Sequence, residues 1–236
     1  MTNYAHLETT MLTILDRNDR ESARDYAYRV IRYNILELFL APGTSVSEKS
    51  LCDQLLISRT PVREALLDLS RQRLVDIVPQ RGTTVSLIDP KMVEEGHFLR
   101  ALVEVEVVRQ VCRLIDDKAF HQLESNVMMQ EYHAGHNALD EFIHLDNEFH
   151  RLLFKICDRE ATYGIVADFQ AHFDRERKLS LQFVSIADLV KDHKAVLEGI
   201  RESDGEKAAA NMQRHLDHVL IDQKLLISRF PQYFAS

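Results

Sequence analysis

The 236-residue sequence has no tryptophan, only three cysteines and only five prolines. The cysteines are odd in number and widely spaced, which argues against a disulfide framework and for a reducing cytoplasm. The longest stretch free of Asp, Glu, Lys and Arg is residues 38–47. That is half of the about 20 residues that a membrane-spanning helix requires, and the amino terminus has no signal-peptide pattern. We therefore expect a cytoplasmic protein without a membrane segment.

Charge is ordinary in amount but uneven in distribution. Charged residues make up 28% of the chain and hydrophobic residues 45%, as in folded proteins, and the net charge is −8. Residues 20–90 are close to neutral, whereas residues 91–236 carry most of the acidic excess. An acidic protein can still bind nucleic acid where its cations gather on one element, so the charge excludes only indiscriminate polyanion binding.

Proline is absent from residues 91–230, which favours stacked helices because proline breaks helix interiors. Asp89-Pro90 is typical of a helix start. The periodicity predicts helices at 91–117, 119–133, 138–157, 161–182, 186–202 and 206–229. We expect a mainly α protein with an N-terminal extension at 1–19, a winged helix-turn-helix at 20–88 and an all-α antiparallel helical bundle at 89–236.

The winged helix-turn-helix is predicted from a regular series of elements. A helix at 22–40 and a turn at 41–43 precede two short helices at 48–55 and 60–71. A β-hairpin follows, with its turn at Pro79-Gln80-Arg81-Gly82. Two short, tightly joined helices and a hairpin are the outline of this DNA-binding fold.

The third of these helices, at 60–71, contains the residues that suit contacts with DNA. Thr60-Pro61 predicts its start, with Thr60 as the cap, and Arg59 and Arg63 project from one side of it. A helix N-terminus favours phosphate, and arginine suits the guanine edge in the major groove. Arg81-Gly82 at the hairpin tip suits the minor groove. The alternative, for an arginine pair taken by itself, is an amphipathic helix whose arginines face solvent and bind nothing.

The stretch from Leu36 to Val85 resembles the GntR superfamily of bacterial transcription regulators, and SRTPVREAL is its most specific piece. The resemblance implies a double-stranded DNA operator as partner. It implies DNA contacts from Lys49, Ser58, Arg59, Thr60, Arg63, Arg81 and Gly82. One departure is Arg73, where the family usually has the glycine that favours a left-handed helix end.

A metal site is predicted in the helical part. Asp146 and His150 are four residues apart on one helix face, and His193 and His215 lie on two later helices. One oxygen and three nitrogen donors suit zinc, or nickel, manganese or iron. Spacing alone leaves a purely structural role open, because distant histidines cannot be paired from sequence.

The segments FLRALVE, LDNEFHRLLF, DHKAVLEGI and AANMQRHLDHV resemble the FCD effector domain of FadR-type GntR regulators. The resemblance implies that Asp146, His150, His193 and His215 hold a divalent metal, with a small carboxylate or sugar acid on its open positions. It also implies a homodimer on a pseudo-palindromic operator. We expect effector contacts from Arg100, Arg175, Arg177 and Asn211, with surface ion pairs as the alternative for the arginines.

Three functions remain open at this stage. The first is a regulator controlled by an organic acid at the metal, and the second is a regulator for which the ion itself is the signal. The third is a metal-dependent enzyme, which we do not expect because four protein ligands leave little room for hydrolytic water. The sequence also contains none of the motifs HExxH, GxSxG or a glycine-rich phosphate loop.

Overall fold

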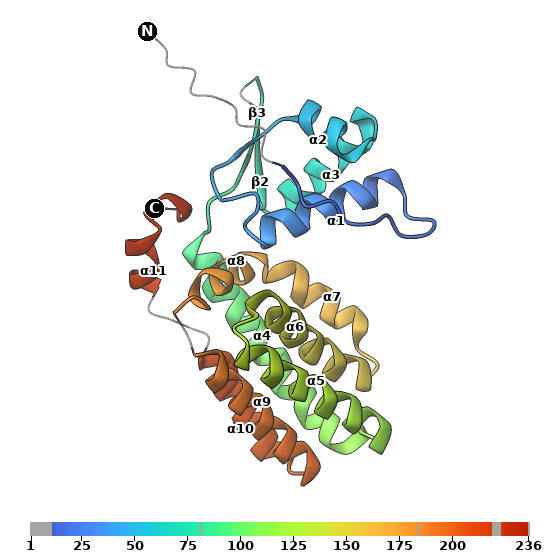
Figure 1. Ribbon diagram of the computed structural model, residues 1–236, viewed down its shortest axis with the longest axis vertical. Coiled ribbons are helices and arrows are strands. Elements are labelled where there is room, and N and C mark those ends of the chain that lie inside the picture. The colour runs from blue at the N-terminus through green and yellow to red at the C-terminus, as the bar shows by residue number, and fades with distance from the viewer. Residues whose placement is uncertain (1–10, 81, 184, 219–222, 236) are drawn as a thin grey trace. The chain divides into compact units, whose positions relative to one another are not determined.

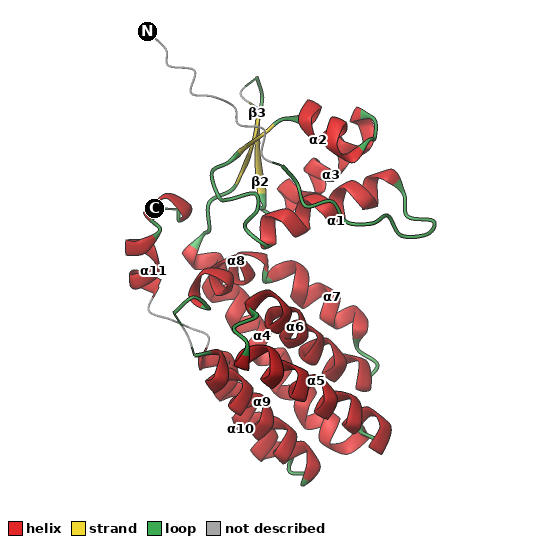
Figure 2. Cartoon of the chain, in the orientation of Figure 1, coloured by secondary structure: helices red, strands yellow, loops and turns green. Residues whose placement is uncertain are grey.

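The computed structural model describes residues 11–80, 82–183, 185–218 and 223–235 (Figure 1). Helices dominate it, with one small sheet (Figure 2). The chain divides into two compact units, Met1–Pro90 together with Arg229–Ser236, and Lys91–Ser228. The expected fold class, a winged helix-turn-helix followed by an all-α bundle, is confirmed. None of the described helices is long and apolar enough to cross a membrane.

The first unit combines helices with an antiparallel sheet. Its elements are α1 (Ala23–Leu36), β1 (Ser45–Val46), α2 (Glu48–Leu55), α3 (Arg59–Arg71), β2 (Val75–Val78) and β3 (Gly82–Val85). The strand order is β1-β3-β2, with Val75 opposite Val85 and Val78 opposite Gly82. The short strand β1 was not predicted, because two residues carry no recognisable alternation. It pairs with β3 and so extends the predicted hairpin to three strands.

The core of this unit lies between α1 and α3. The two helices pack on each other, and their fully buried apolar residues are Val30, Ile31, Ile35, Val62, Leu66 and Leu69. The prediction that the first helix extends to residue 40 is wrong. It ends at Leu36 because the backbone of Leu38 turns left-handed, with φ 61°, ahead of the Pro42-Gly43 turn.

Residues 11–18 pack onto the first unit. The amide of Leu12, which is buried, donates to Gln54 Oε1 over 2.8 Å. Thr13 and Asn34 exchange two hydrogen bonds, from the Thr13 amide to Asn34 Oδ1 at 2.8 Å and from Asn34 Nδ2 to the Thr13 carbonyl at 2.9 Å. Since Asn34 is fully buried, this segment supplies partners that water cannot. Residues 1–10 of the expected extension lie outside the described residues.

The end of α3 places arginine in a conformation that favours glycine. Arg73 has φ 59° and follows Gln72, the last half-helical residue of α3. A left-handed backbone strains a residue with a Cβ by roughly 1–2 kcal/mol. We therefore expect Arg73→Gly to raise the free energy of unfolding by about 1 kcal/mol, a gain reduced by the greater chain entropy of unfolded glycine. Urea denaturation of the parent and Arg73→Gly measures it, and Arg71→Gly, inside α3, should destabilise instead.

The second unit is all-helical. Its helices are α4 (Pro90–Leu114), α5 (Asp117–Gly135), α6 (Leu139–Ile156), α7 (Glu160–Phe169), α8 (Ala171–Ser180), α9 (Ile186–Arg201), α10 (Gly205–His218) and α11 (Gln223–Arg229). Helix α5 packs on α6 and α9, and α9 packs on α10. Four of the six helices predicted here are confirmed to within three residues at each end.

One helix prediction is wrong in length, and another is tested only in part. The expected helix at 161–182 is broken at Gln170, whose ψ of 10° leaves the helical region where the chain lies against Gly96 of α4. No proline or glycine marks this break. The expected helix at 206–229 is confirmed over α10 and α11, whereas residues 219–222 lie outside the described residues, so its continuity stays a prediction.

A close approach of α9 and α10 depends on one glycine. A Cβ added to Gly199 would lie 2.7 Å from the backbone nitrogen of Ala208, far closer than real side chains come. Gly199 therefore allows the two helices to pack backbone to backbone. Two predicted metal ligands, His193 and His215, lie on these helices.

Candidate functional site

The predicted DNA-reading residues gather at the amino-terminal end of α3. Ser58 is its N-cap, and Ser58, Arg59, Thr60 and Arg63 are all exposed. The prediction of Thr60 as the cap is wrong, because the helix begins at Arg59 and places Pro61 third in it. Proline costs nothing there, since the first four amides of a helix have no partner within it. The opposite side of α3 is buried, as predicted, through Val62, Ala65, Leu66 and Leu69.

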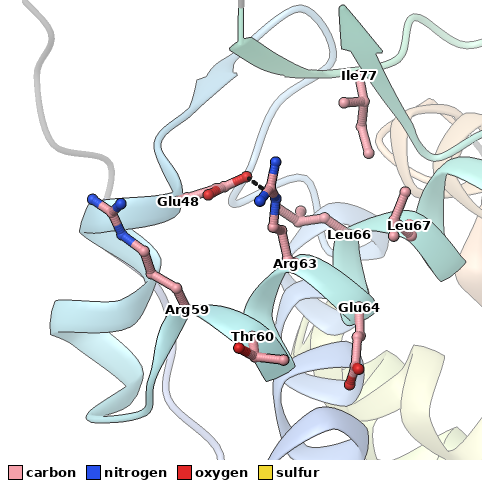
Figure 3. A pocket seen from close by; sticks show the side chains of 8 residues that line it. All are labelled: Glu48, Arg59, Thr60, Arg63, Glu64, Leu66, Leu67 and Ile77. Carbon is pink, nitrogen blue, oxygen red and sulfur yellow. Dashed lines mark ion pairs between the residues drawn. The ribbon is translucent and has the colours of Figure 1, made fainter. Parts of the chain in front are cut away.

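A hollow with a mixed lining lies beside this helix end (Figure 3). Arg59 and Arg63 extend from α3, while Ile77 of β2 and Leu67 supply half-exposed apolar surface. Glu48, in the first turn of α2, places its Oε1 3.4 Å from Arg63 Nε. Sequence reasoning missed Glu48, because the ion pair joins two helices and has no spacing signal. A carboxylate there orients Arg63 without burying it, since the arginine side chain is 74% exposed.

The remaining predicted DNA contacts flank this hollow. Lys49, the second residue of α2, is exposed. Gly82, where β3 begins, is exposed and has φ 104°, a left-handed conformation suited to glycine. Arg81 lies outside the described residues. Lys49 of α2, the exposed side chains of α3 and Gly82 of the β2–β3 hairpin, which we call the wing, therefore belong to the same unit.

The four predicted metal ligands come together in the second unit. One ligand atom from each of Asp146, His150, His193 and His215 lies within 4.8 Å of all the others, and all four residues are buried. His215 Nε2 is 3.2 Å from His150 Nε2 and 3.0 Å from His193 Nε2. Asp146 Oδ1 lies 3.7 Å from His193 Nε2. Three helices, α6, α9 and α10, thus direct one carboxylate and three imidazoles at one point.

The far side of two imidazole rings is held by acceptors. His150 Nδ1 is 2.5 Å from Glu104 Oε2, and His193 Nδ1 is 2.6 Å from Gln130 Oε1. The Gln130 amide is oriented by its own donation to Asn126 Oδ1 at 2.7 Å. The acceptor at His193 Nδ1 places the proton there and leaves the Nε2 lone pair of this ring facing the other ligands. Such outer partners are typical of metal-binding histidines.

Sequence reasoning missed Glu104 and Gln130 as partners of these ligands. Glu104 could have been found, because it stands four residues after Arg100, a helical ion-pair spacing inside an apolar run. Gln130 has no such signal, since its contact with α9 depends on how α5 packs. Both side chains are buried, so their polar atoms need partners within the protein.

Electrostatics keeps the ligands in the protonation states that metals require. Burial alone would raise the pKa of Asp146, but Arg177, His150 and His193 lower it to about 2. Burial lowers the pKa of His193 to about 3, and it lowers the pKa of His215 well below its ordinary value. At neutral pH Asp146 is therefore a carboxylate, and His193 and His215 are neutral imidazoles. This donor set fits a divalent ion of the zinc type.

The predicted effector residues divide into two groups. Arg177 donates from Nη1 to Asp146 Oδ2 at 2.7 Å, and Arg100 Nε lies 2.7 Å from Glu104 Oε1. Both arginines are therefore directly beside the ligand cluster. Arg175, fully buried, contacts His172 at 3.0 Å, and Asn211 Nδ2 donates to the Ala195 carbonyl at 2.7 Å. Neither of these two hydrogen bonds involves one of the four ligands: that of Arg175 lies within α8, and that of Asn211 joins α10 to α9.

A buried glutamate near this region makes stability depend on pH. Burial raises the pKa of Glu176 on α8 to about 6, although Gln223 donates a hydrogen bond to it. The folded state thus holds its proton more tightly than the unfolded state, and stability falls as pH rises from about 4.5 to 6. We expect Glu176→Gln to be more stable than the parent by up to about 2 kcal/mol at pH 7.5 and equal to it at pH 4.5. Denaturation across this range measures it, with the exposed Glu198→Gln as a control that shows no such trend.

Comparison with known proteins assigns both units. Residues 24–85 match the gntR family of bacterial regulatory proteins, and residues 95–218 match the FCD domain. The transcriptional repressor RspR of Escherichia coli K12 is 32% identical over 203 residues, 86% of this chain and 89% of that protein. An HTH-type regulator of Streptomyces ambofaciens is 34% identical over 222 residues, 93% of this chain and 92% of that protein.

The fold has solved counterparts as well. The structure of Escherichia coli McbR/YncC aligns with a TM-score of 0.74 over 90% of this chain and 99% of that chain, at 16% identity. These relatives are regulators and not enzymes, which removes the third of the functions considered above. The chain belongs to the GntR family of bacterial transcriptional regulators and carries the FCD effector domain of its FadR-type members.

Proposed function

We propose that this regulator binds its operator under the control of a small carboxylate or sugar acid held at a divalent metal in the helical unit. Residues 20–88 read the DNA, and residues 89–236 hold the metal, the effector and the dimer contact. The observation that carries the proposal is the convergence of Asp146, His150, His193 and His215. Zinc is the first candidate ion, with nickel, manganese and iron as alternatives.

Charge balance favours an anionic effector. The centre contains two buried arginines, Arg100 and Arg177, which the carboxylates of Glu104 and Asp146 neutralise. A divalent ion adds two positive charges that these residues leave uncompensated. Four protein ligands with one donor atom each leave two positions on a six-coordinate ion, which carboxylate oxygens can fill. Arg177 or Arg100 can then bind the same carboxylate through its paired donors.

The test is elemental analysis of the purified protein, followed by operator binding. Fluorescence anisotropy on DNA selected from a random pool would be measured with chelator, with Zn²⁺, and with Zn²⁺ plus gluconate, citrate or lactate. We expect the ion to bind stoichiometrically and an acid to change the operator affinity. Control by Zn²⁺ alone would favour the metal-sensor alternative. A protein that binds none of the four metals would contradict the proposal.

The proposed homodimer has a candidate face on α4 and α7. Phe98 and Leu102 of α4 are 65% and 63% exposed, and Ile165 of α7 is 68% exposed. The two helices adjoin, because a Cβ on Gly96 would lie 3.2 Å from the Cα of Gln170, directly after α7. Apolar side chains this exposed favour burial against a second copy. Two copies would present two copies of α3 to the half-sites of a pseudo-palindromic operator.

The dimer is tested by light scattering on Leu102→Glu. We expect this charge to convert the dimer to monomer at micromolar concentration and to weaken binding to a two-half-site operator. Leu114→Glu, equally exposed near the end of the same helix, is the matched control. A dimer that survives Leu102→Glu together with Ile165→Glu would exclude this face.

A further inference from the structure

The end of the chain returns to the DNA-binding unit. We call residues 230–235, which follow α11, the strap. The amide of Ile88 donates to the Tyr233 carbonyl over 2.8 Å, and the amide of Ala235 donates to the Ile88 carbonyl over 2.9 Å. Ile88 and Phe234 form a parallel β-bridge, and both are buried, at 0% and 4% exposure. Both backbone groups of Ile88 therefore find their partners in the strap.

The bridge joins the two places where the chain passes between units. The chain leaves the first unit directly after Ile88, at Pro90–Lys91, and returns to it at Ser228–Arg229. Residues 91–228 therefore connect Ile88 to the strap, whose Tyr233 and Ala235 are hydrogen-bonded to Ile88. A parallel bridge always needs such a crossover, and here the crossover is the whole metal-binding unit.

Residues of the metal centre lie on the helices at both ends of this crossover. Helix α4, which begins at Pro90, carries Arg100 and Glu104, and α10 carries the ligand His215. The chain then continues from α10 through α11 into the strap. Helix α4 follows the linker at residues 89–90 directly, and α11 leads directly into the strap, so both chain connections of the second unit end at the bridge.

On the other side, the bridge is next to the wing. Ile88 follows β3 by three residues, and the intervening Ser86 amide donates to the Leu74 carbonyl over 3.0 Å. The Ser86 hydroxyl also donates to the Arg73 carbonyl. Leu74 and Arg73 link α3 to β2, so Ser86, two residues before Ile88, is hydrogen-bonded to the connection between α3 and the wing.

We propose that the strap is a coupling segment that transmits occupancy of the metal centre to the wing, with Phe234 and the two Ile88 hydrogen bonds as its attachment. This inference rests on the proposed function of the metal centre. The strap acts beside the single covalent linker at residues 89–90, and it makes the position of the wing depend on both α4 and α10. Phe234 is a positioning residue, because it contacts neither DNA nor metal in this assignment.

One substitution can remove a single hydrogen bond of this attachment. Phe234 has φ −106° and ψ 142°, the conformation preferred before proline, so Ala235→Pro removes the amide that bonds Ile88 without forcing Phe234 to move. Ala235→Gly keeps that amide and is the matched control. Phe234→Ala is a second variant that weakens the attachment without altering the backbone. Thermal melting of each variant shows that the full chain is folded.

The measurement is hydrogen exchange of the β2–β3 peptides, Val75–Val85, with and without one equivalent of Zn²⁺. In Ala235→Gly we expect Zn²⁺ to change exchange there by at least about fivefold, as a shift in local opening. In Ala235→Pro and Phe234→Ala we expect less than about twofold change at unaltered Zn²⁺ affinity. Equal responses in all variants, or none in any while Zn²⁺ binds, would overturn the coupling role.

Failure of the metal site is distinguishable from failure of the strap. If no variant binds Zn²⁺, the proposed function fails, and a packing change replaces the ion as the perturbation. Met212→Ala empties a fully buried position on α10, three residues before the ligand His215. Combined with Ala235→Gly, Met212→Ala should change hydrogen exchange at β2–β3, and combined with Ala235→Pro it should not. An effect that persists with Pro would reject the strap.

Discussion

Replacing His150 with alanine is expected to lower the affinity for Zn²⁺ by more than about 100-fold. Loss of an outer-sphere partner already costs about 10–100-fold in metal affinity, and a direct ligand contributes more. His150 Nε2 faces the other ligands from α6, 3.2 Å from His215 Nε2. Isothermal titration after removal of bound metal measures the loss. His144→Ala, an exposed histidine on the same helix, should leave the affinity unchanged.

The melting temperature provides a second test of His150→Ala. A ligand at 1,000 times its dissociation constant stabilises the folded state by about 4 kcal/mol, so a chelator should lower the melting temperature of the parent. The variant should melt at one temperature with and without chelator. Glu104→Gln, which removes the charge that faces His150 Nδ1, should give an intermediate loss of about 10–100-fold. Unchanged Zn²⁺ affinity in His150→Ala would show that the four residues are not a metal site.

Replacing Arg59 with alanine is expected to weaken operator binding by about 1–3 kcal/mol, or roughly 5–150-fold, and to relax the preference for one base pair. Arg59 is the first residue of α3 and fully available to DNA, because it is exposed and, among the described residues, forms no ion pair. Its paired donors match the guanine edge in the major groove. Anisotropy titrations on a selected operator and on single-base variants of it measure both effects.

Arg71→Ala is the matched control for Arg59→Ala. Arg71 ends the same helix, its side chain is 80% exposed, and it forms an ion pair with Asp68. The substitution Arg71→Ala removes the same charge from the far end of α3. It should therefore change the operator affinity little and leave the base preference unchanged. Binding by Arg59→Ala as tight and as selective as that of the parent would mean that α3 reads DNA from another position.

The amino-terminal end of α3 was largely predictable, because the residues that define it are close together in the sequence. The Ser58–Arg63 segment contains its cap, its proline and its cations within six residues, and the buried face of α3 follows from helical spacing. The error at Thr60 arose because both Ser58 and Thr60 are good caps, and spacing alone does not choose between them. Glu48 was missed because its ion pair depends on how α2 crosses α3.

The metal centre was predictable only in part from the residues alone. Asp146 and His150 share a face by helical geometry, but His193 and His215 meet only because Gly199 lets α9 and α10 approach closely. Family resemblance supplied that pairing. The break at Gln170 had no signal either, since it reflects packing against Gly96 and not a helix-breaking residue.

The hydrogen bonds between Thr13 and Asn34 bear on how this protein is cloned. The gntR match begins at residue 24, and a gene trimmed to that point would delete Thr13 and Leu12 together. The side-chain amide of Asn34, fully enclosed in α1, would then lose both its donor and its acceptor in that segment. A stranded amide of this kind costs about 1–3 kcal/mol, a large share of the stability of a small domain. A poor yield of protein from such a shortened gene would therefore reflect the loss of residues 11–18 and not a defect of the DNA-binding fold.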